Sequence, residues 1–228
     1  MRLIRKLTRR FRRDERGMAA IEFAMSLGAV VTLGVYGTEM SNLALAHLKV
    51  SQMALGLADN ISRVGLKSAL AQQQLREADI NDALVGVQMQ GAAMSMGTRG
   101  RITISSIQVN PQGGQWIKWQ RCLGIRQGAG WDSSYGVQDQ GSTGTSFTGM
   151  GPPGQEVTAP PNSAVIFVEI NYDYQPVINF GLDTARKLTY VASLVVRDNR
   201  DLTTVYNPNP TATSMTCDKH LSTVPKRG

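Results

Sequence analysis

The chain has 228 residues, enough to bury one sizeable core or two small ones, and a formal net charge of +7. Residues 1–17 carry eight Arg and Lys against two carboxylates, a net charge of +6, so only +1 remains for everything after Gly17. Because the basic residues form a leader rather than a binding face, the charge argues against a nucleic-acid partner and favours contact with anionic lipid head groups.

An apolar run follows this leader. Residues 18–38 contain one charged side chain, Glu22, and as a helix they would rise about 31 Å, the thickness of a bilayer's hydrocarbon core. A basic cluster beside such a span is held on the cytoplasmic side. The pattern therefore predicts a basic cytoplasmic leader over 1–17, a single transmembrane helix over 18–38, and a periplasmic part beyond the bacterial inner membrane.

Glu22 is the unusual residue of this span. A carboxylate at the centre of a membrane helix costs roughly 2.5–3.5 kcal/mol, and less near an end, so such a group is first interpreted as functional. Its natural partner is an α-amino group at Met18, which a cut after Gly17 would create. That cut makes Glu22 the fifth residue of the mature chain, with an aromatic residue, Phe23, next to it.

The string R-D-E-R-G-M-A-A-I-E-F-A-M, which ends at Met25, resembles the prepilin processing site of TadE-like minor pseudopilins of the tight-adherence (Tad/Flp) type IVb pilus apparatus. The similarity covers about residues 12–55. Many members of the family carry a proline in the apolar run, where this chain has Gly28 nearby.

This resemblance implies cleavage by a prepilin peptidase between Gly17 and Met18, followed by a structural function in pilus assembly. It implies a pilin-like domain outside the membrane and partners among other pilins, pseudopilins and Tad secretion components. It also implies that Glu22 pairs with the terminal amine of an adjacent subunit, with Phe23 beside it in the helix-pairing segment.

Two ordinary export signals compete with this interpretation. Arg9-Arg10 has the form of a twin-arginine signal, but the apolar core does not follow it closely. The sequence 44–46 has the small-x-small form of a signal-peptidase site, and a cut after Ala46 would release a soluble domain. The apolar run is long for a signal peptide. The alternative function is a periplasmic binding module, either released in this way or anchored and never cut at Gly17.

An amphipathic helix is predicted to continue over 39–74. Its apolar positions recur at spacings of three and four, with polar side chains on the opposite face. Gly56 and Gly65 each weaken the helix by about 1 kcal/mol relative to Ala, so a bend or break is expected near them. The apolar stripe packs either on the chain's own core or on another subunit. It consists of Leu43, Ala46, Val50, Met53, Leu57, Ile61 and Val64.

A periplasmic α+β domain is predicted over 75–201. A helix over 75–94, with Asp79 as a capping residue, is followed by four segments of strand-like alternation. The first segment shifts phase near Ser105 and Ser106, which indicates a β-bulge. Strands that follow helices favour an antiparallel sheet. The four segments are 101–109, 116–121, 164–174 and 188–197.

Residues 124–162 interrupt this alternation. Nine of the chain's 23 glycines fall in the first 31 residues of the stretch, together with Trp131, Tyr135 and Phe147. Such a segment is either a partner-binding loop or disordered, and disorder is the simpler expectation. Residues 197–201 are expected to be a solvated strand end, and 202–228 an extended tail.

Cys122 and Cys217 are the two cysteines. In an oxidising periplasm they can pair, closing a loop for which the chain-entropy estimate is on the order of 4.5 kcal/mol. Free thiols and a metal site are the alternatives, but His47 and His220 give no ligand spacing with them. The sequence contains no phosphate-binding loop, dinucleotide fingerprint or recognisable nucleophile–base pair. We therefore expect no metal, no cofactor and no enzymatic activity.

Overall fold

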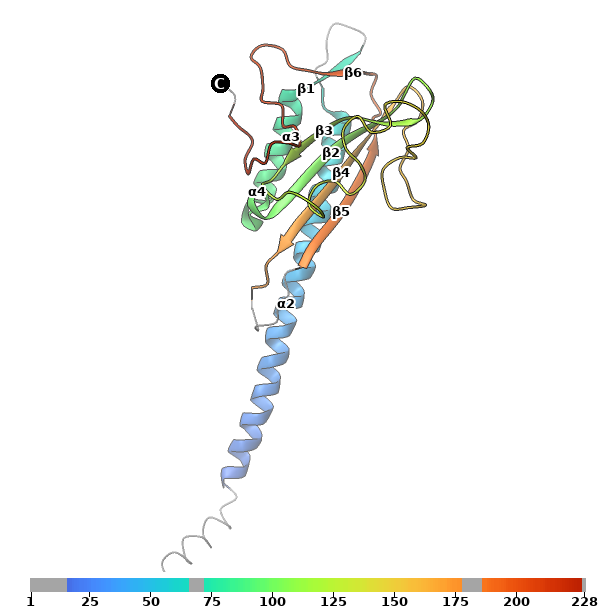
Figure 1. Cartoon of the computed structure of the whole chain (residues 1–228). Coiled ribbons are helices and arrows are strands. Elements are labelled where there is room, and N and C mark those ends of the chain that lie inside the picture. Colours follow the sequence, from blue (N-terminus) through green and yellow to red (C-terminus); the bar gives the residue numbers. More distant parts are fainter. Residues whose placement is uncertain (1–15, 66–71, 178–185, 227–228) are drawn as a thin grey trace, which may run out of the picture. The chain divides into compact units, whose positions relative to one another are not determined.

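The computed structural model describes residues 16–65, 72–177 and 186–226 (Figure 1). The chain divides into two compact units, each considered by itself below. The first unit is Met1–Ala44 with Pro176–Asp183, and the second is Leu45–Gln175 with Thr184–Gly228. Most of the predicted leader, up to position 15, lies outside the described residues.

One long helix, α2 (Arg16–Arg63), includes both the predicted span and most of the predicted amphipathic segment. It runs through Gly56 and ends at Arg63, not at residue 74 as predicted. A distant side chain caps this end. The guanidinium of Arg200 donates to the main-chain oxygens of Ile61 at 2.9 Å and Val64 at 2.6 Å. These bonds satisfy carbonyl groups that a helix leaves unpaired at its C-terminus.

The apolar stripe of α2 belongs to the chain's own core, in the second unit. Its central positions are buried, together with two neighbouring alanines, whereas Leu43 and Val64 at its two ends are half-buried. Of the two predicted uses of the stripe, packing on the chain's own core is therefore the one observed. The buried residues are Ala46, Val50, Met53, Ala54, Leu57, Ala58 and Ile61.

Four strands form one sheet in the spatial order β3-β2-β4-β5, and every neighbouring pair is antiparallel. The predicted α+β class with an antiparallel sheet is confirmed. The bulge lies at the predicted level but on the neighbouring strand, because Ser106 pairs with Trp119 and Ile107 with Ile117. The strands are β2 (Gly100–Val109), β3 (Gln115–Leu123), β4 (Ala164–Tyr174) and β5 (Arg186–Val195).

The sheet of the second unit is covered on both faces. Tyr190 on β5 pairs with Ile170 on β4, and its hydroxyl lies 2.9 Å from Nδ1 of His47, so α2 covers this face (Figure 1). Side chains alternate between faces along a strand, so Glu169 points the other way. There its carboxylate accepts hydrogen bonds from the main-chain N–H of Ser134. The polar side of β4 is therefore buried beneath the 124–162 segment.

In place of the single helix predicted over 75–94, Leu75 belongs to a strand, one helix ends at Gln90, and shorter helical turns follow. Asp79 stands at the third position of the first helix and accepts a 3.0 Å hydrogen bond from the main-chain N–H of Arg76. It is thus the reciprocal partner of the N-cap rather than the cap itself. The elements are β1 (Gln73–Arg76), α3 (Glu77–Gln90), η1 (Ala92–Met94) and α4 (Met96–Arg99).

A second sheet, which the sequence did not predict, has two strands. β1 pairs in parallel with β6 (Arg200–Tyr206). The prediction of a solvated strand end over 197–201 is wrong for Arg200, which is buried and caps α2. The chain therefore returns beside the end of α2 after completing the main sheet.

Residues 124–162 fold onto the sheet, so the expectation of disorder is wrong. Met150 and Val157 form an isolated antiparallel bridge. The glycines serve turns and close approaches: at Gly141, φ is +75° and a Cβ would lie 2.2 Å from the main-chain oxygen of Gln115. The segment closes a small core with Ile107, Ile117, Met150, Ala159, Val165 and Phe167, against which Tyr135, Phe147 and Val157 pack.

The tail also packs on the second unit and is not a free extension. Met215 is fully buried, and its main-chain oxygen accepts a 2.7 Å hydrogen bond from the N–H of Cys122. Farther along, a Cβ on Gly97 of α4 would lie 1.9 Å from the main-chain oxygen of Ser222. Glycine at position 97 therefore allows the tail to lie directly against the α4 backbone.

Candidate functional site

The predicted processing residues lie in the first two turns of α2. Gly17 and Met18 are in the first turn, Glu22 and Phe23 follow one turn later, and all four are exposed. A Cβ placed on Gly17 would have no atom within 4 Å outside the local helix backbone. Nothing in the described chain therefore requires a glycine at position 17.

The spacing from Met18 to Glu22 is one helical turn, so a cut after Gly17 would leave the new amine one turn from this carboxylate. None of the ion pairs among the described residues involves Glu22. Its side chain is exposed on the helix.

The N-terminal half of α2 presents apolar side chains around the helix. Within the described residues, α2 is the one helix long and apolar enough to cross a membrane, which is consistent with single-pass membrane anchoring. The exposed large side chains include Met18, Ile21, Phe23, Met25, Leu27, Val30, Val31, Leu33 and Tyr36.

The serine and threonine hydroxyl groups of residues 26–41 bond to the helix itself. Each donates to a main-chain oxygen three or four residues earlier, at distances of 2.8 to 3.0 Å. This back-bonding satisfies the hydroxyl hydrogen without water, as a helix in hydrocarbon requires. The pairs are Ser26 with Phe23, Thr32 with Gly28, Thr38 with Val35, and Ser41 with Gly37.

Glu39 follows the apolar run, still in the first unit. Its carboxylate accepts a 3.0 Å hydrogen bond from the main-chain N–H of Val177, in the connection that leaves β4. Glu22 and Glu39, the two carboxylates of the N-terminal half of α2, therefore differ in their surroundings.

The two cysteines are joined as predicted. Cys122 and Cys217 form a disulfide with their Cα atoms 4.8 Å apart. Beside it, the buried guanidinium of Arg101 donates to the main-chain oxygens of Gly124 and Cys217 and to the carboxylate of Asp132. Burial lowers the pKa of Arg101, and Asp132 partly opposes this shift. The bridge and Arg101 together fasten the tail to the end of β3.

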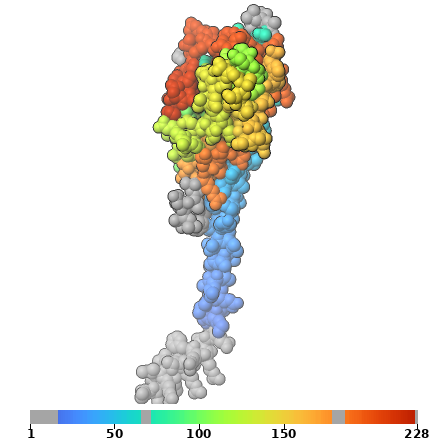
Figure 2. All heavy atoms as spheres, turned by 45° about the vertical axis from the view of Figure 1, so that its right-hand side comes forward, coloured from blue at the N-terminus to red at the C-terminus, as the bar shows by residue number. Residues whose placement is uncertain are grey.

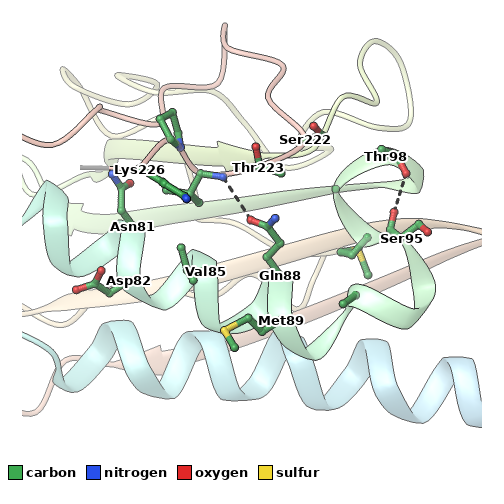
Figure 3. A pocket seen from close by; sticks show the side chains of 15 residues that line it. Asn81, Asp82, Val85, Gln88, Met89, Ser95, Thr98, Ser222, Thr223 and Lys226 are labelled. Carbon is green, nitrogen blue, oxygen red and sulfur yellow. Dashed lines mark hydrogen bonds between the residues drawn. The ribbon is translucent and has the colours of Figure 1, made fainter. Parts of the chain in front are cut away.

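A cavity of about 1000 Å³ lies between α3, α4 and the tail (Figure 3). Val85 and Met89 form part of its apolar wall, and Gln88 accepts a 3.3 Å hydrogen bond from the N–H of Val224 across it. Asp82 and Lys226 are its charged lining residues.

In the part of the chain that the structure describes, no group of three or more His, Cys, Asp or Glu side chains is placed to hold a metal ion. Comparison of the whole chain with known proteins found no matching family model, no matching curated protein and no matching solved structure.

The structure thus brings together the two cysteines and places Gly17, Met18, Glu22 and Phe23 on one helix segment. Sequence reasoning missed Arg101 and the cavity. A single arginine within the alternating segment 101–109 was the available signal for Arg101, since a charge in a strand that is buried on both faces needs partners.

Proposed function

We propose that the chain is a TadE-like minor pseudopilin that takes part in the assembly of a Flp-type pilus after a prepilin peptidase cuts it between Gly17 and Met18. The observation that carries the proposal is the position of Glu22. It is the one charged side chain of 18–38, exposed on α2 and one turn from the amine that the cut creates.

The physical reason for such a carboxylate lies in the new helix end. The cut leaves a charged α-amino group at Met18 and unpaired N–H groups in the first turn, and both attract negative charge, as does the helix macrodipole. In lipid an unpaired carboxylate is costly. Pairing Glu22 with the amine of an adjacent subunit relieves that cost in both chains and sets their axial register.

The two halves of α2 support the same proposal. One half exposes apolar side chains with internally bonded hydroxyls, and the other packs its stripe beneath an antiparallel sheet. A pilin-like subunit needs both properties in one helix. We place residues 1–17 in the cytoplasm, the span in the inner membrane and the second unit in the periplasm, an oxidising compartment that suits the disulfide.

A permanently anchored or released binding module is the second candidate, and the cavity beside α3 favours it. Such a protein would use its periplasmic surface to bind a partner and would never be cut at Gly17. The N-terminus of the protein recovered from cells distinguishes the two functions.

The test is the intact mass of the protein produced with its cognate prepilin peptidase. The wild type should begin at Met18, and Gly17→Val should keep the leader because the peptidase requires a small residue at the cut. Gly28→Val is the matched control, since a Cβ at either glycine has no atom within 4 Å, and it should be processed normally. A wild-type chain that begins at Met1 contradicts the proposal, and one that begins at His47 establishes the released module.

A further inference from the structure

The two outer strands of the main sheet differ in the hydrogen bonding of their outer edges. The edge of β3 is closed by main-chain hydrogen bonds: Ile117 donates to Gln140 at 2.9 Å, Asp139 donates to Ile117 at 2.8 Å, and Cys122 donates to Met215 at 2.7 Å. On β5, no hydrogen bond from a described residue reaches the main-chain groups that face away from β4. Within the part of the chain that the structure describes, the edge of β5 is therefore open.

The register identifies the unpaired groups. Val196 donates its N–H to the oxygen of Ala164 at 2.8 Å, and the pairing of β4 with β5 continues from there without a bulge. In an antiparallel strand, the N–H and C=O of one residue point to the same side and alternate along the strand. The residues whose main-chain groups point outward are therefore Lys187, Thr189, Val191, Ser193 and Val195.

Beyond its first two residues, this edge lacks the usual protection against pairing. Proteins shield an outer strand by keeping it short, by bulges, or by prolines and charged side chains. β5 is ten residues long and regular, and residues 188–195 contain neither a charge nor a proline. Val191 is 37% exposed and Val195 is 43% exposed. Atoms of this part of the chain, orange in Figure 2, reach the molecular surface.

We infer that the β5 edge takes up an extended, antiparallel strand from another protein of the pilus assembly, an inference that rests on the proposed function. The incoming strand would exchange main-chain hydrogen bonds with the five outward residues, the mode known as β-augmentation. It would be uncharged along most of its length. Arg186 is exposed at the start of β5, and Lys187 beside it donates from Nζ to the main-chain oxygen of Gly130 at 2.7 Å. Their positive charge favours an acidic residue at the C-terminal end of the incoming strand.

Pairing with a second copy of this chain would reverse one second unit relative to the other. In the second unit, β5 and the C-terminal part of α2 run in the same direction, because Tyr190 meets His47 and Arg200, after β5, meets Ile61. Antiparallel pairing of two β5 strands would therefore make the C-terminal parts of the two α2 helices run in opposite directions.

Site-specific photo-crosslinking of the full chain, in cells that assemble the pilus, tests the inference. Val191 and Val195 are replaced singly by p-benzoylphenylalanine, and Leu48, exposed on α2, serves as the control position. Adducts from the two β5 positions should map to one segment of one other protein, about four residues apart and in reverse order, as antiparallel pairing requires. Leu48 should give no adduct in that segment.

Two variants then test the role of the main chain. Ser193→Pro removes an outward N–H but no hydrogen bond to β4, and it should reduce the adduct yield at least tenfold. Val191→Lys leaves the backbone unchanged but adds a charge to the edge. With the crosslinker at position 195, it should lower the yield of adducts. A non-reducing peptide map that shows the Cys122–Cys217 bridge verifies that each variant is folded.

Adducts to a second copy, adducts scattered over several segments, an unchanged yield in both variants, or no adduct at all would each overturn the inference. Processing is measured in the same cells. A chain that begins at Met18 without adducts overturns the edge pairing alone. A chain that begins at Met1 overturns the proposed function, while the crosslink map still decides whether the edge is paired.

Discussion

At the scale of single residues, the two carboxylates of the N-terminal half of α2 offer a direct comparison. Glu39 accepts a hydrogen bond from the main-chain N–H of Val177, whereas Glu22 takes part in none of the ion pairs formed by described residues. An exposed carboxylate within an apolar run gains most from a partner that another chain supplies.

We therefore expect Glu22→Ala to impair pilus assembly while cleavage and membrane insertion remain intact. Glu39→Gln, which changes a carboxylate that already has a partner within the chain, should leave assembly near the wild-type level. Piliation and surface attachment are scored in strains that carry only the variant, and gel mobility reports processing. Normal pili in the Glu22→Ala strain would show that Glu22 is a tolerated charge at the lipid boundary.

Arg101, beside the disulfide, shows why some residues with many partners were not predicted from the sequence. Its alternating position in β2 was evident, but its acceptors are the main-chain oxygens of Gly124 and Cys217, which come from two distant segments. Main-chain carbonyls carry no residue identity, so no sequence pattern indicates them. The cysteine pair was predictable because thiols have few partners other than each other and metals.

At the scale of elements, local periodicity predicted the elements that have one regular apolar face. The bounds predicted for β4 are those observed, because its apolar residues alternate along the whole strand. β1 and β6 were missed because they are short and stabilise each other only after the chain has returned. The end of α2 was misplaced for a related reason, since its cap, Arg200, lies far along the sequence.

This cap leads to a prediction about stability. Arg200→Met should leave the carbonyls of Ile61 and Val64 without their donor, at a cost of about 1–3 kcal/mol for each acceptor that remains buried and unpaired. Arg63→Met is the matched control, because Arg63 pairs with Asp59 on the exposed side of the same helix turn. That pair should contribute less than about 1 kcal/mol.

Urea denaturation of the detergent-solubilised full chain, followed by circular dichroism, measures both variants. If Arg200→Met lowers the free energy of unfolding no more than Arg63→Met does, water replaces the guanidinium at the helix end.

At the scale of the whole molecule, the disulfide is the principal covalent constraint on the second unit. Cys122 and Cys217 are 95 residues apart, so the chain-entropy estimate for the bridge is on the order of 4.5 kcal/mol. Cys217→Ser should lower the free energy of unfolding by a few kcal/mol, and reduction of the wild type should have a similar effect. Calorimetry with and without reductant measures it. Quantitative alkylation of both thiols in unreduced protein would contradict the bridge.

The 124–162 segment shows the limit of composition as a guide to order. Its glycines and prolines suggested disorder, yet Met150 is buried and Asn110 holds the segment through hydrogen bonds to the main-chain oxygens of Gly141 and Gly144, at 2.8 and 2.7 Å. The glycines are irregularly spaced because each serves a particular turn. Only the sheet beneath the segment determines which turns are needed.

The disulfide also has a consequence for the order of events during export. On the proposed topology, strand β3 with Cys122 reaches the periplasm while Cys217 is still to be translocated, and Arg101 at that stage lacks its acceptor on Cys217. The first cysteine must therefore wait as a free thiol, open to mixed disulfides with periplasmic oxidants. The completed bridge is therefore present only in chains that have crossed the membrane at least to position 217. Its formation can be measured to follow maturation.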